Sequence, residues 1–298
     1  MVAVPQSFRS MPRWWSDERG REWLDRLPLL VDRQCERWGL TVDGESIHGS
    51  NALVVPVLRG PQVAVLRLAP LGDDVATEVA ALAHWDGRGV VRLLDAAPDA
   101  GASLLERLDH TRSLADEPLA AAVVTLGELT RLLAIPAPAA APSTRTIARE
   151  AVEPFPKEWD ALGQPTSRIL LEEAVRTASW LAERDAPSTS VDGDLHFEQV
   201  LAGGRYPWTV VDPVLLQGDG EYDVGRVLWS RPDELDTDRD VLTAFKAFVT
   251  AADVPAERAR AWAIVRSMSY LLWGLRNGLT LDPPKCERLL RIFIRNSE

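Results

Sequence analysis

One segment in the second half of the chain constrains its fold more than any other. It contains an Asp-Gly-Asp run that ends at Asp194, an amide at Gln199 and a second acid at Asp212. Two short apolar stretches, at 200–201 and 208–211, flank a Gly-Gly pair and predict a β-hairpin between the amide and the second acid. Any fold of this chain must therefore hold two carboxylates and an amide beside one hairpin.

These three side chains have the spacing that phosphoryl transfer from a nucleotide requires. Asp194 is predicted to accept the proton of an attacking hydroxyl, while Gln199 and Asp212 are predicted to hold Mg²⁺ on the phosphates of ATP. Oxygen ligands suit this hard cation, which keeps several of its waters. An Asp-Gly-Asp run alone is a common turn, but the hairpin and the Gly-Asp-Gly-Glu-Tyr-Asp sequence at 218–223 favour a phosphotransfer site.

The segments around these residues resemble the aminoglycoside phosphotransferase superfamily. The signature of that superfamily is His-Gly-Asp-Leu-His-x-x-Asn, then Ile-Asp-Pro, then Gly-Asp-x-x-Tyr-Asp-Leu. Related sequences stand here at 192–199, 211–213 and 218–224, and the resemblance covers the chain from about residue 20 to about residue 230. The branch of streptomycin 6-kinases and hydroxyurea kinases is more similar still, on the segments 23–28, 37–40, 85–89, 91–95 and 104–108.

The resemblance implies a bilobal, protein-kinase-like α+β fold. Residues 1–104 are expected to form an N-terminal helix and a small antiparallel sheet that binds the nucleotide. Residues 105–113 are expected to be the hinge. Residues 114–298 are expected to form a mostly helical lobe that carries the catalytic loop and the substrate site.

Hydrophobic periodicity predicts elements that agree with this division. An amphipathic helix over 17–38 should end at Gly39, and Asp73-Asp74 should cap a helix that runs to Trp85. Pro56 predicts an edge position or an irregularity in its strand, and the five prolines within 135–156 predict a loop or a broken connector. The expected strands are 52–58, 62–68, 90–94 and 103–107, and the later helices are 119–133, 169–185, 258–277 and 285–296.

A nucleotide-binding cation is predicted at Arg67, in the strand 62–68. Glu78, on the following helix, is predicted to hold it by an ion pair that mirrors the lysine–glutamate pair of kinases. The family usually has lysine at this position, and arginine keeps the charge on a wider, planar group. Ser50 and Asn51 follow a His-Gly sequence that resembles the phosphate loop of the family, and they are predicted to cradle phosphate oxygens.

Two further positions differ from the family signature. Asp192 replaces its leading histidine, and a second acid beside Asp194 is expected to raise one pKa by like-charge repulsion. Gln199 replaces the metal-binding asparagine and has one more methylene. His196 is expected to support the loop by hydrogen bonds, and Asp223 is expected to brace it, as the corresponding acid does in the family.

Three functions are compatible with these residues. The first is transfer of the γ-phosphoryl group of ATP to a hydroxyl of a small molecule; the resemblance implies streptomycin or a related aminoglycoside, and hence antibiotic resistance. The second is the same chemistry on another natural product or sugar intermediate. The third is a pseudokinase that binds a nucleotide or small molecule without turnover. The departures at Arg67, Asp192 and Gln199 favour this third function, whereas the retention of Asp194 and Asp212 opposes it.

Charge and composition narrow the partners of the chain. The 298 residues include 33 basic and 44 acidic ones, so the net charge of −11 argues against a nucleic-acid partner and suits a cationic substrate. Cys35 and Cys286 form no disulfide framework or zinc pattern. No membrane span and no secretory signal are predicted, so the expected location is cytoplasmic. The oligomeric state is not predicted. The acids considered for a cationic substrate are Glu158, Asp160, Asp219, Glu221 and Glu234.

Overall fold

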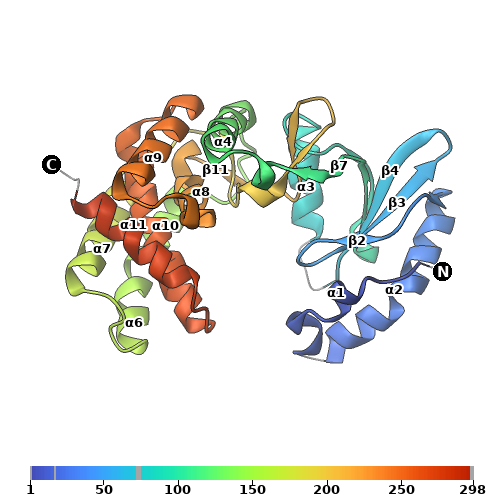
Figure 1. Cartoon of the computed structure of the whole chain (residues 1–298), viewed down its shortest axis with the longest axis horizontal. Coiled ribbons are helices and arrows are strands. Elements are labelled where there is room, and N and C mark those ends of the chain that lie inside the picture. The colour runs from blue at the N-terminus through green and yellow to red at the C-terminus, as the bar shows by residue number, and fades with distance from the viewer. Residues whose placement is uncertain (1, 17, 72–74, 296–298) are drawn as a thin grey trace. The chain divides into compact units, whose positions relative to one another are not determined.

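The computed structural model describes residues 2–16, 18–71 and 75–295 (Figure 1). The chain divides into two compact units, Met1–His110 with Ala202–Thr209, and Thr111–Leu201 with Val210–Glu298. The segment 202–209, which the sequence assigned to the helical lobe, groups with the first unit instead. The reason is a close approach of its hairpin to the chain near Leu108, because a Cβ at Gly204 would lie 3.1 Å from that side chain.

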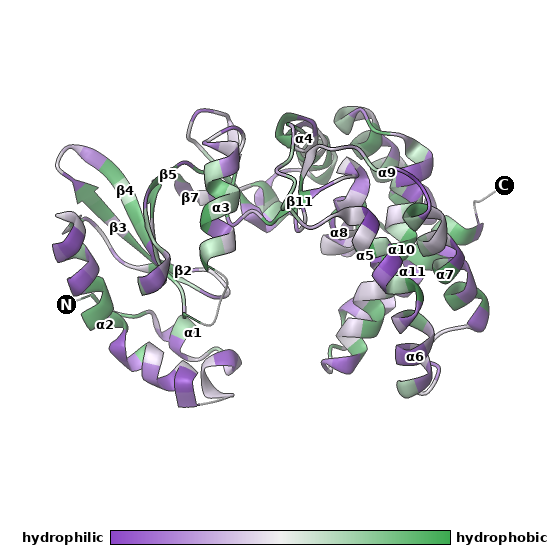
Figure 2. Ribbon diagram, turned by 180° about the vertical axis from the view of Figure 1, so that it is seen from behind, coloured by the Kyte–Doolittle hydropathy of each residue, from purple (hydrophilic) through white to green (hydrophobic). Residues whose placement is uncertain are grey.

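The first unit is built on an antiparallel sheet of six strands in the order β1-β3-β4-β6-β5, with β2 also paired to β3. Figure 2 shows hydrophobic residues along β3 and β4, which form the predicted hairpin in register from Leu53↔Leu68 to Arg59↔Gln62. The strands are β1 (Thr41–Val42), β2 (Ile47–His48), β3 (Leu53–Arg59), β4 (Gln62–Leu68), β5 (Leu93–Ala97) and β6 (Ala102–Glu106).

Pro56 lies at a gap in the outer pairing of β3. The strand pairs with β2 at residues 53–54 and with β1 at residues 57–58. Pro56 lies between these two paired segments, so neither β1 nor β2 has a residue opposite it. Its carbonyl points to this outer side and accepts a hydrogen bond from the Asp43 N–H at 2.8 Å. Since the N–H of a strand residue points to the same side as its carbonyl, the proline removes no hydrogen bond to β4. The predicted irregularity is confirmed.

Three helices complete the first unit: α1 (Gln6–Arg9), α2 (Glu18–Trp38) and α3 (Val75–Trp85). Leu24, Leu27 and Val31 of α2 are buried in the same core cluster as the inner residues of the sheet. Gly39 follows α2 with a φ of +62°, the left-handed conformation that ends helices and suits glycine. The predicted first residue of the helix over 17–38, Asp17, and the predicted helix caps, Asp73 and Asp74, lie outside the described residues.

The strand predicted at 90–94 is displaced toward the C-terminus. Gly87 and Gly89 have positive φ values, so the turn after α3 extends further than the apolar run suggests. Arg92 then donates its backbone N–H to the carboxylate of Glu106, at 2.8 Å, and β5 begins only at Leu93.

The second unit is mostly helical, and β8 pairs antiparallel with β11 within it. The prediction of a loop or broken connector over 135–156 was wrong for the second half of this range, because α5 and the first three residues of α6 lie there. Pro154 stands in the first turn of α6, where a missing N–H removes no helical hydrogen bond. The elements are α4 (Leu119–Leu133), α5 (Thr144–Val152), α6 (Pro154–Ala161), α7 (Arg168–Ala182), β8 (Ser190–Asp192), β11 (Leu215–Gln217), α8 (Val224–Ser230), α9 (Asp238–Ala252), α10 (Ala256–Arg276) and α11 (Asp282–Arg295).

Three short strands, β7 (Asp109–Ser113), β9 (Val200–Ala202) and β10 (Trp208–Val210), form a separate sheet in the order β10-β9-β7. β9 and β10 are the two strands predicted around the Gly-Gly pair. Among the described residues, none of the helices has both the length and the apolar character that a membrane span requires.

Candidate active site

Asp194, Gln199 and Asp212 lie in the second unit, where short elements position their side chains. β8 ends at Asp192, the 3₁₀ helix η4 (Phe197–Gln199) follows, and Asp212 comes directly after the segment that contains β10. The loop packs tightly against β11, because a Cβ at Gly193 would lie 2.6 Å from the Leu216 side chain. Only glycine fits there without displacing Leu216.

Asp194 is accessible, with 43% of its side chain exposed. Its Oδ1 accepts a hydrogen bond from Nε of Arg226, at 3.1 Å, and its Oδ2 lies 3.9 Å from Nε2 of His196. Arg226 therefore restrains one carboxylate oxygen. A half-exposed carboxylate with one restrained oxygen can present the other to a hydroxyl proton.

Arg226 was not among the residues predicted from the sequence. It lies on α8, three residues after Asp223, and this helical spacing could have placed it near the loop that Asp223 was expected to brace. Nothing in the superfamily signature, as quoted, includes an arginine at that position.

His196 is held in the neutral form. Burial, the larger cause, and the positive charge of Arg226 together lower the pKa of His196 to about 4, while Glu198 opposes the shift. At neutral pH the imidazole carries no charge, and its 3.9 Å distance from Asp194 is too long for a hydrogen bond, so the predicted support of the loop by hydrogen bonds is not seen at this contact.

Asp192 connects the backbone at Asp194 to the backbone at Val214 by hydrogen bonds. Its Oδ1 accepts hydrogen bonds from the backbone N–H of Asp194 at 3.2 Å and of Val214 at 3.1 Å. Burial raises the pKa of Asp192 to about 7; the two backbone hydrogen bonds oppose the shift, and the charges of Asp194 and Asp212 add to it. The expected increase is confirmed, but its main cause is burial rather than like-charge repulsion.

The raised pKa of Asp192 predicts that the protein becomes less stable to unfolding as pH rises. Between about pH 4 and about pH 7 the folded protein keeps this proton and the unfolded chain releases it, so the free energy of unfolding decreases as pH rises through this window. We expect the Asp192→Asn substitution to remove this contribution to the pH dependence, which is at most roughly 4 kcal/mol between the two pH limits. Urea unfolding at pH 4.5 and pH 8, in EDTA and without nucleotide, measures the change in the free energy of unfolding.

Asp160→Asn provides the control for this experiment, because Asp160 is exposed. Burial raises the pKa of Glu221 to about 7 as well, so the Asp192 variant should keep part of the pH dependence. Identical slopes for the Asp192 variant and the unmodified protein would contradict the prediction.

Gln199 and Asp212 are adjacent through a backbone contact. Nε2 of Gln199 donates to the carbonyl of Asp212 at 3.0 Å, and the Val211 N–H donates to the carbonyl of Gln199 at 2.8 Å. Asp212 has a φ of +57°, an uncommon conformation for a residue with a side chain. The two residues are thus held together in a strained local geometry of the kind that clusters at functional sites.

The donor set of Gln199 and Asp212 fits Mg²⁺. Oε1 of Gln199 is buried and has no hydrogen-bond partner among the residues that the structure describes. Leaving such an oxygen unsatisfied costs about 1–3 kcal/mol, so a ligand is expected there. The described residues contain no cluster of three or more His, Cys, Asp or Glu side chains suited to a metal; Mg²⁺ commonly takes only one or two carboxylates, with phosphates and water supplying the rest.

Asp223 supports the loop from the 3₁₀ helix η5 (Gly220–Asp223). It is buried, accepts a hydrogen bond from the Leu195 backbone, and lies 3.7 Å from Nη2 of Arg266 on α10. Burial raises the pKa of Asp223 well above its usual value, and Arg266 opposes the shift. Asp192 and Asp223 also line one cavity of about 10 Å³, on the order of a single water molecule.

The acids considered for a cationic substrate differ in their availability. Asp219 has 1% of its side chain exposed and accepts hydrogen bonds from Arg258, at 2.5 and 2.9 Å, and from Trp262, at 2.8 Å. Asp219 was therefore wrongly considered, because its oxygens are already occupied by the protein. Glu221 is buried, Glu158 pairs with Arg276, Glu234 pairs with Arg231, and Asp160 is exposed.

In the first unit, three of the four predicted nucleotide-binding residues lie together. Nη1 of Arg67, on β4, lies 2.6 Å from Oε2 of Glu78, on α3, and both side chains are largely buried. Nη2 of Arg67 also donates to Oδ1 of Asn51 at 3.3 Å. Ser50 is exposed, and only its backbone carbonyl has a described contact, with Arg13 at 3.5 Å.

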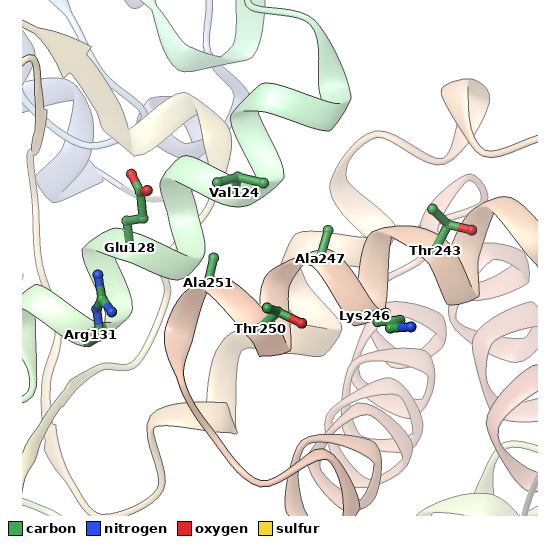
Figure 3. Close-up of a pocket in the computed structure, with 8 residues that line it drawn as sticks. All are labelled: Val124, Glu128, Arg131, Thr243, Lys246, Ala247, Thr250 and Ala251. Carbon is green, nitrogen blue, oxygen red and sulfur yellow. The ribbon is translucent and has the colours of Figure 1, made fainter.

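A groove of about 510 Å³ lies elsewhere in the second unit, between α4 and α9 (Figure 3). None of the side chains that line it belongs to the predicted site, so its size alone does not mark it as catalytic. The lining residues are Val124, Glu128, Arg131, Thr243, Lys246, Ala247, Thr250 and Ala251.

Comparisons with known proteins identify the family to which the chain is similar. A profile of the aminoglycoside/hydroxyurea antibiotic resistance kinase family matches residues 37–278. The chain is 35% identical to a streptomycin 6-kinase of Streptomyces glaucescens, over 95% of this chain and 94% of the relative. It is 34% identical to a hydroxyurea phosphotransferase of Kitasatospora aureofaciens, over 96% and 84%.

Solved structures show the same fold. Aminoglycoside phosphotransferase APH(4)-Ia superposes with a TM-score of 0.66 at 17% identity, covering 91% of this chain and 99% of that one. The choline kinase LicA from Streptococcus pneumoniae superposes with a TM-score of 0.60 at 11% identity, covering 91% and 99%. The protein-kinase-like α+β fold that the sequence implied is confirmed.

Proposed function

This chain belongs to the aminoglycoside/hydroxyurea antibiotic resistance kinases, and on that premise we propose that it transfers the γ-phosphoryl group of ATP to a hydroxyl of streptomycin or a related aminoglycoside. The observation that carries the proposal is the accessible carboxylate of Asp194, restrained by Arg226 on a loop that Asp192 and Asp223 hold from behind. The net charge of −11 suits a polycationic acceptor.

Asp194 acts as the proton acceptor. Phosphoryl transfer asks little covalent chemistry of the protein, so catalysis depends on positioning and on charge neutralisation. Arg226 holds Oδ1 of Asp194 by its hydrogen bond, so Oδ2 receives the hydroxyl proton as the new O–P bond forms and the bond from the γ-phosphorus to the bridging oxygen breaks, with ADP as the leaving group. The neutral imidazole of His196 leaves the negative charge of this carboxylate in place.

Mg²⁺ would be held by the Gln199 amide oxygen and the Asp212 carboxylate, and when bound it supplies positive charge to the phosphates. The hydrogen bond from Gln199 Nε2 to the Asp212 carbonyl orients the amide so that Oε1 remains for the metal. The additional methylene of glutamine is thus accommodated by the backbone contact.

Arg67 contacts the nucleotide phosphates in this proposal. Its ion pair with Glu78 and its hydrogen bond to Asn51 restrain the guanidinium in the way that the lysine–glutamate pair restrains the lysine of kinases. The substitution of arginine for lysine keeps the positive charge. Arg67 therefore does not by itself argue for a pseudokinase.

Hydroxyurea is a second acceptor to test, because the relative named hydroxyurea phosphotransferase is nearly as similar as the streptomycin 6-kinase. Mass spectrometry of each compound after incubation with the protein and MgATP tests the proposal. We expect streptomycin to gain one phosphoryl group in an ATP-dependent reaction that EDTA prevents. Calorimetric binding of ATP without phosphorylation of either compound would contradict it and favour a binding role.

A further inference from the structure

Three aromatic rings form a continuous stack in the second unit. Trp229 on α8 stacks on Tyr270 of α10, with centroids 5.0 Å apart and planes inclined by 12°, and Tyr270 stacks on Trp273 at 5.2 Å and 22°. Trp229 is buried, whereas 42% of Trp273 is exposed. The stack therefore runs from a buried ring to a ring that is accessible at the surface.

The buried end of the stack is anchored by charged neighbours. Arg266 lies over the ring of Trp229, at 6.0 Å from its centroid, and over that of Tyr222, at 4.1 Å. These contacts restrain the stack at its buried end. Trp273 is thus a pre-positioned surface ring, because one of its faces is already occupied by Tyr270.

The stack lies beside the side chain that restrains the proposed proton acceptor. Arg226 contacts Asp194 at 3.1 Å and precedes Trp229 by one helical turn. Burial raises the pKa of Tyr270, Asp282 adds to the shift, and the positive charge of Arg226 opposes it. Arg226 shares one face of α8 with Trp229, the ring on which Tyr270 stacks.

Several charged groups near the stack are paired with a group of opposite charge. The Tyr270 hydroxyl donates to Oδ2 of Asp282 at 3.4 Å, and Nζ of Lys285 lies 3.2 Å from Oδ1 of the same residue. Arg226 is similarly balanced by Asp194. An aromatic surface with balanced charges at its edge favours a ligand that stacks and forms hydrogen bonds over one that binds by charge alone.

We propose that Trp273, supported by Tyr270, is a stacking subsite for the C–H face of a hydroxylated saturated ring of the acceptor, such as an aminocyclitol or amino sugar. The π-face of tryptophan is negative, and the C–H bonds of a polyhydroxylated ring are polarised with hydrogen positive. Asp282 and the Tyr270 hydroxyl accept or donate hydrogen bonds at the edge. The inference rests on the proposed function, because it assigns this subsite to the same acceptor.

Calorimetric titration of streptomycin into nucleotide-free protein tests the subsite. Trp273→Ala should weaken binding about tenfold, equivalent to about 1.4 kcal/mol, and Trp273→Phe should lose less because it keeps an aromatic face. Trp15→Ala is the matched control, since Trp15 is 56% exposed but lies in the first unit. Equal affinities of the Trp273→Ala variant and the unmodified protein would overturn the inference.

Proton NMR of streptomycin provides a readout that a merely structural role would not change. Ring C–H protons that stack on Trp273 should shift upfield with the unmodified protein, and the shift should be lost with Trp273→Ala and retained with Trp15→Ala. Hydroxyurea has no ring, so its binding should be the same for both variants. Absence of streptomycin binding by the unmodified protein would also overturn the subsite.

These outcomes separate the subsite from the proposed function. Phosphorylation of streptomycin with unchanged affinity in Trp273→Ala would leave the kinase proposal intact and remove the subsite. Weakened binding in this variant, together with no phosphorylation by the unmodified protein, would support the subsite and contradict the kinase proposal.

Discussion

Replacement of Asp194 with Asn should reduce the rate of phosphoryl transfer to streptomycin by about 10²- to 10⁴-fold, the range typical for loss of a general base. The amide keeps the shape of the side chain but cannot accept the hydroxyl proton. ATP affinity should remain within about twofold, because Asp194 is assigned to the acceptor and not to the nucleotide. Steady-state kinetics with streptomycin and calorimetry with ATP measure the two effects.

Asp95→Asn is a matched control for this variant. Asp95 is 39% exposed and pairs with Arg59 at 3.0 Å, much as Asp194 is 43% exposed and pairs with Arg226 at 3.1 Å. Both substitutions remove a half-exposed ion pair of small energy, about 0–1 kcal/mol. Only the Asp194 variant should lose activity; equal activities of the two variants would remove Asp194 from the mechanism.

Replacement of Asp219 with Ala should cause the largest loss of stability that we expect from a single acid in the second unit. It would leave the Arg258 guanidinium and the Trp262 N–H without their acceptor in a buried environment. Breaking a buried ion pair in this way costs about 3–5 kcal/mol. The corresponding decrease in Tm is roughly 10 °C, measured as the thermal transition of the second unit.

Asp160→Ala distinguishes this structural role from substrate recognition. Both acids were candidates for binding a cationic acceptor, but Asp160 is exposed and its contact in the second unit is a hydrogen bond from Gln164 at 3.3 Å. We expect its Tm to change by less than about 2 °C. An Asp219 variant as stable as the Asp160 variant would show that the buried network is not stabilising.

Elements with strong local patterns were predictable from the sequence. The hairpin of β3 and β4 has alternating apolar residues around a turn, and α4 was predicted with the bounds Leu119–Leu133 that it has. The failure over 135–156 has a physical reason. Proline is unfavourable inside a helix but tolerated in its first turn, and the sequence alone does not say which of the two positions a given proline holds.

The residues proposed for catalysis and substrate binding differ in the same way in how far the sequence predicts them. Asp194, Gln199 and Asp212 could be selected because their chemistry depends on residue type and on spacing along one loop. Arg226 was not selected, because its contact with Asp194 joins residues 32 positions apart and only its helical spacing from Asp223 points to the loop. The stack beneath Trp273 has both kinds of contact: Tyr270 lies three residues away on the same helix, whereas Trp229 joins the stack only because α8 packs against α10.

The sequence by itself therefore determined the kinase-like fold, through its resemblance to a known family, and the acids available for the chemistry, through their spacing along the chain. Only the tertiary structure decided what each acid can do. Asp194 remains half-exposed, whereas Asp192, Asp219 and Asp223 are buried. Burial depends on neighbours distant in the sequence, and it is burial that chiefly raises the pKa of Asp192 and Asp223 and makes the ion pair of Asp219 a structural one.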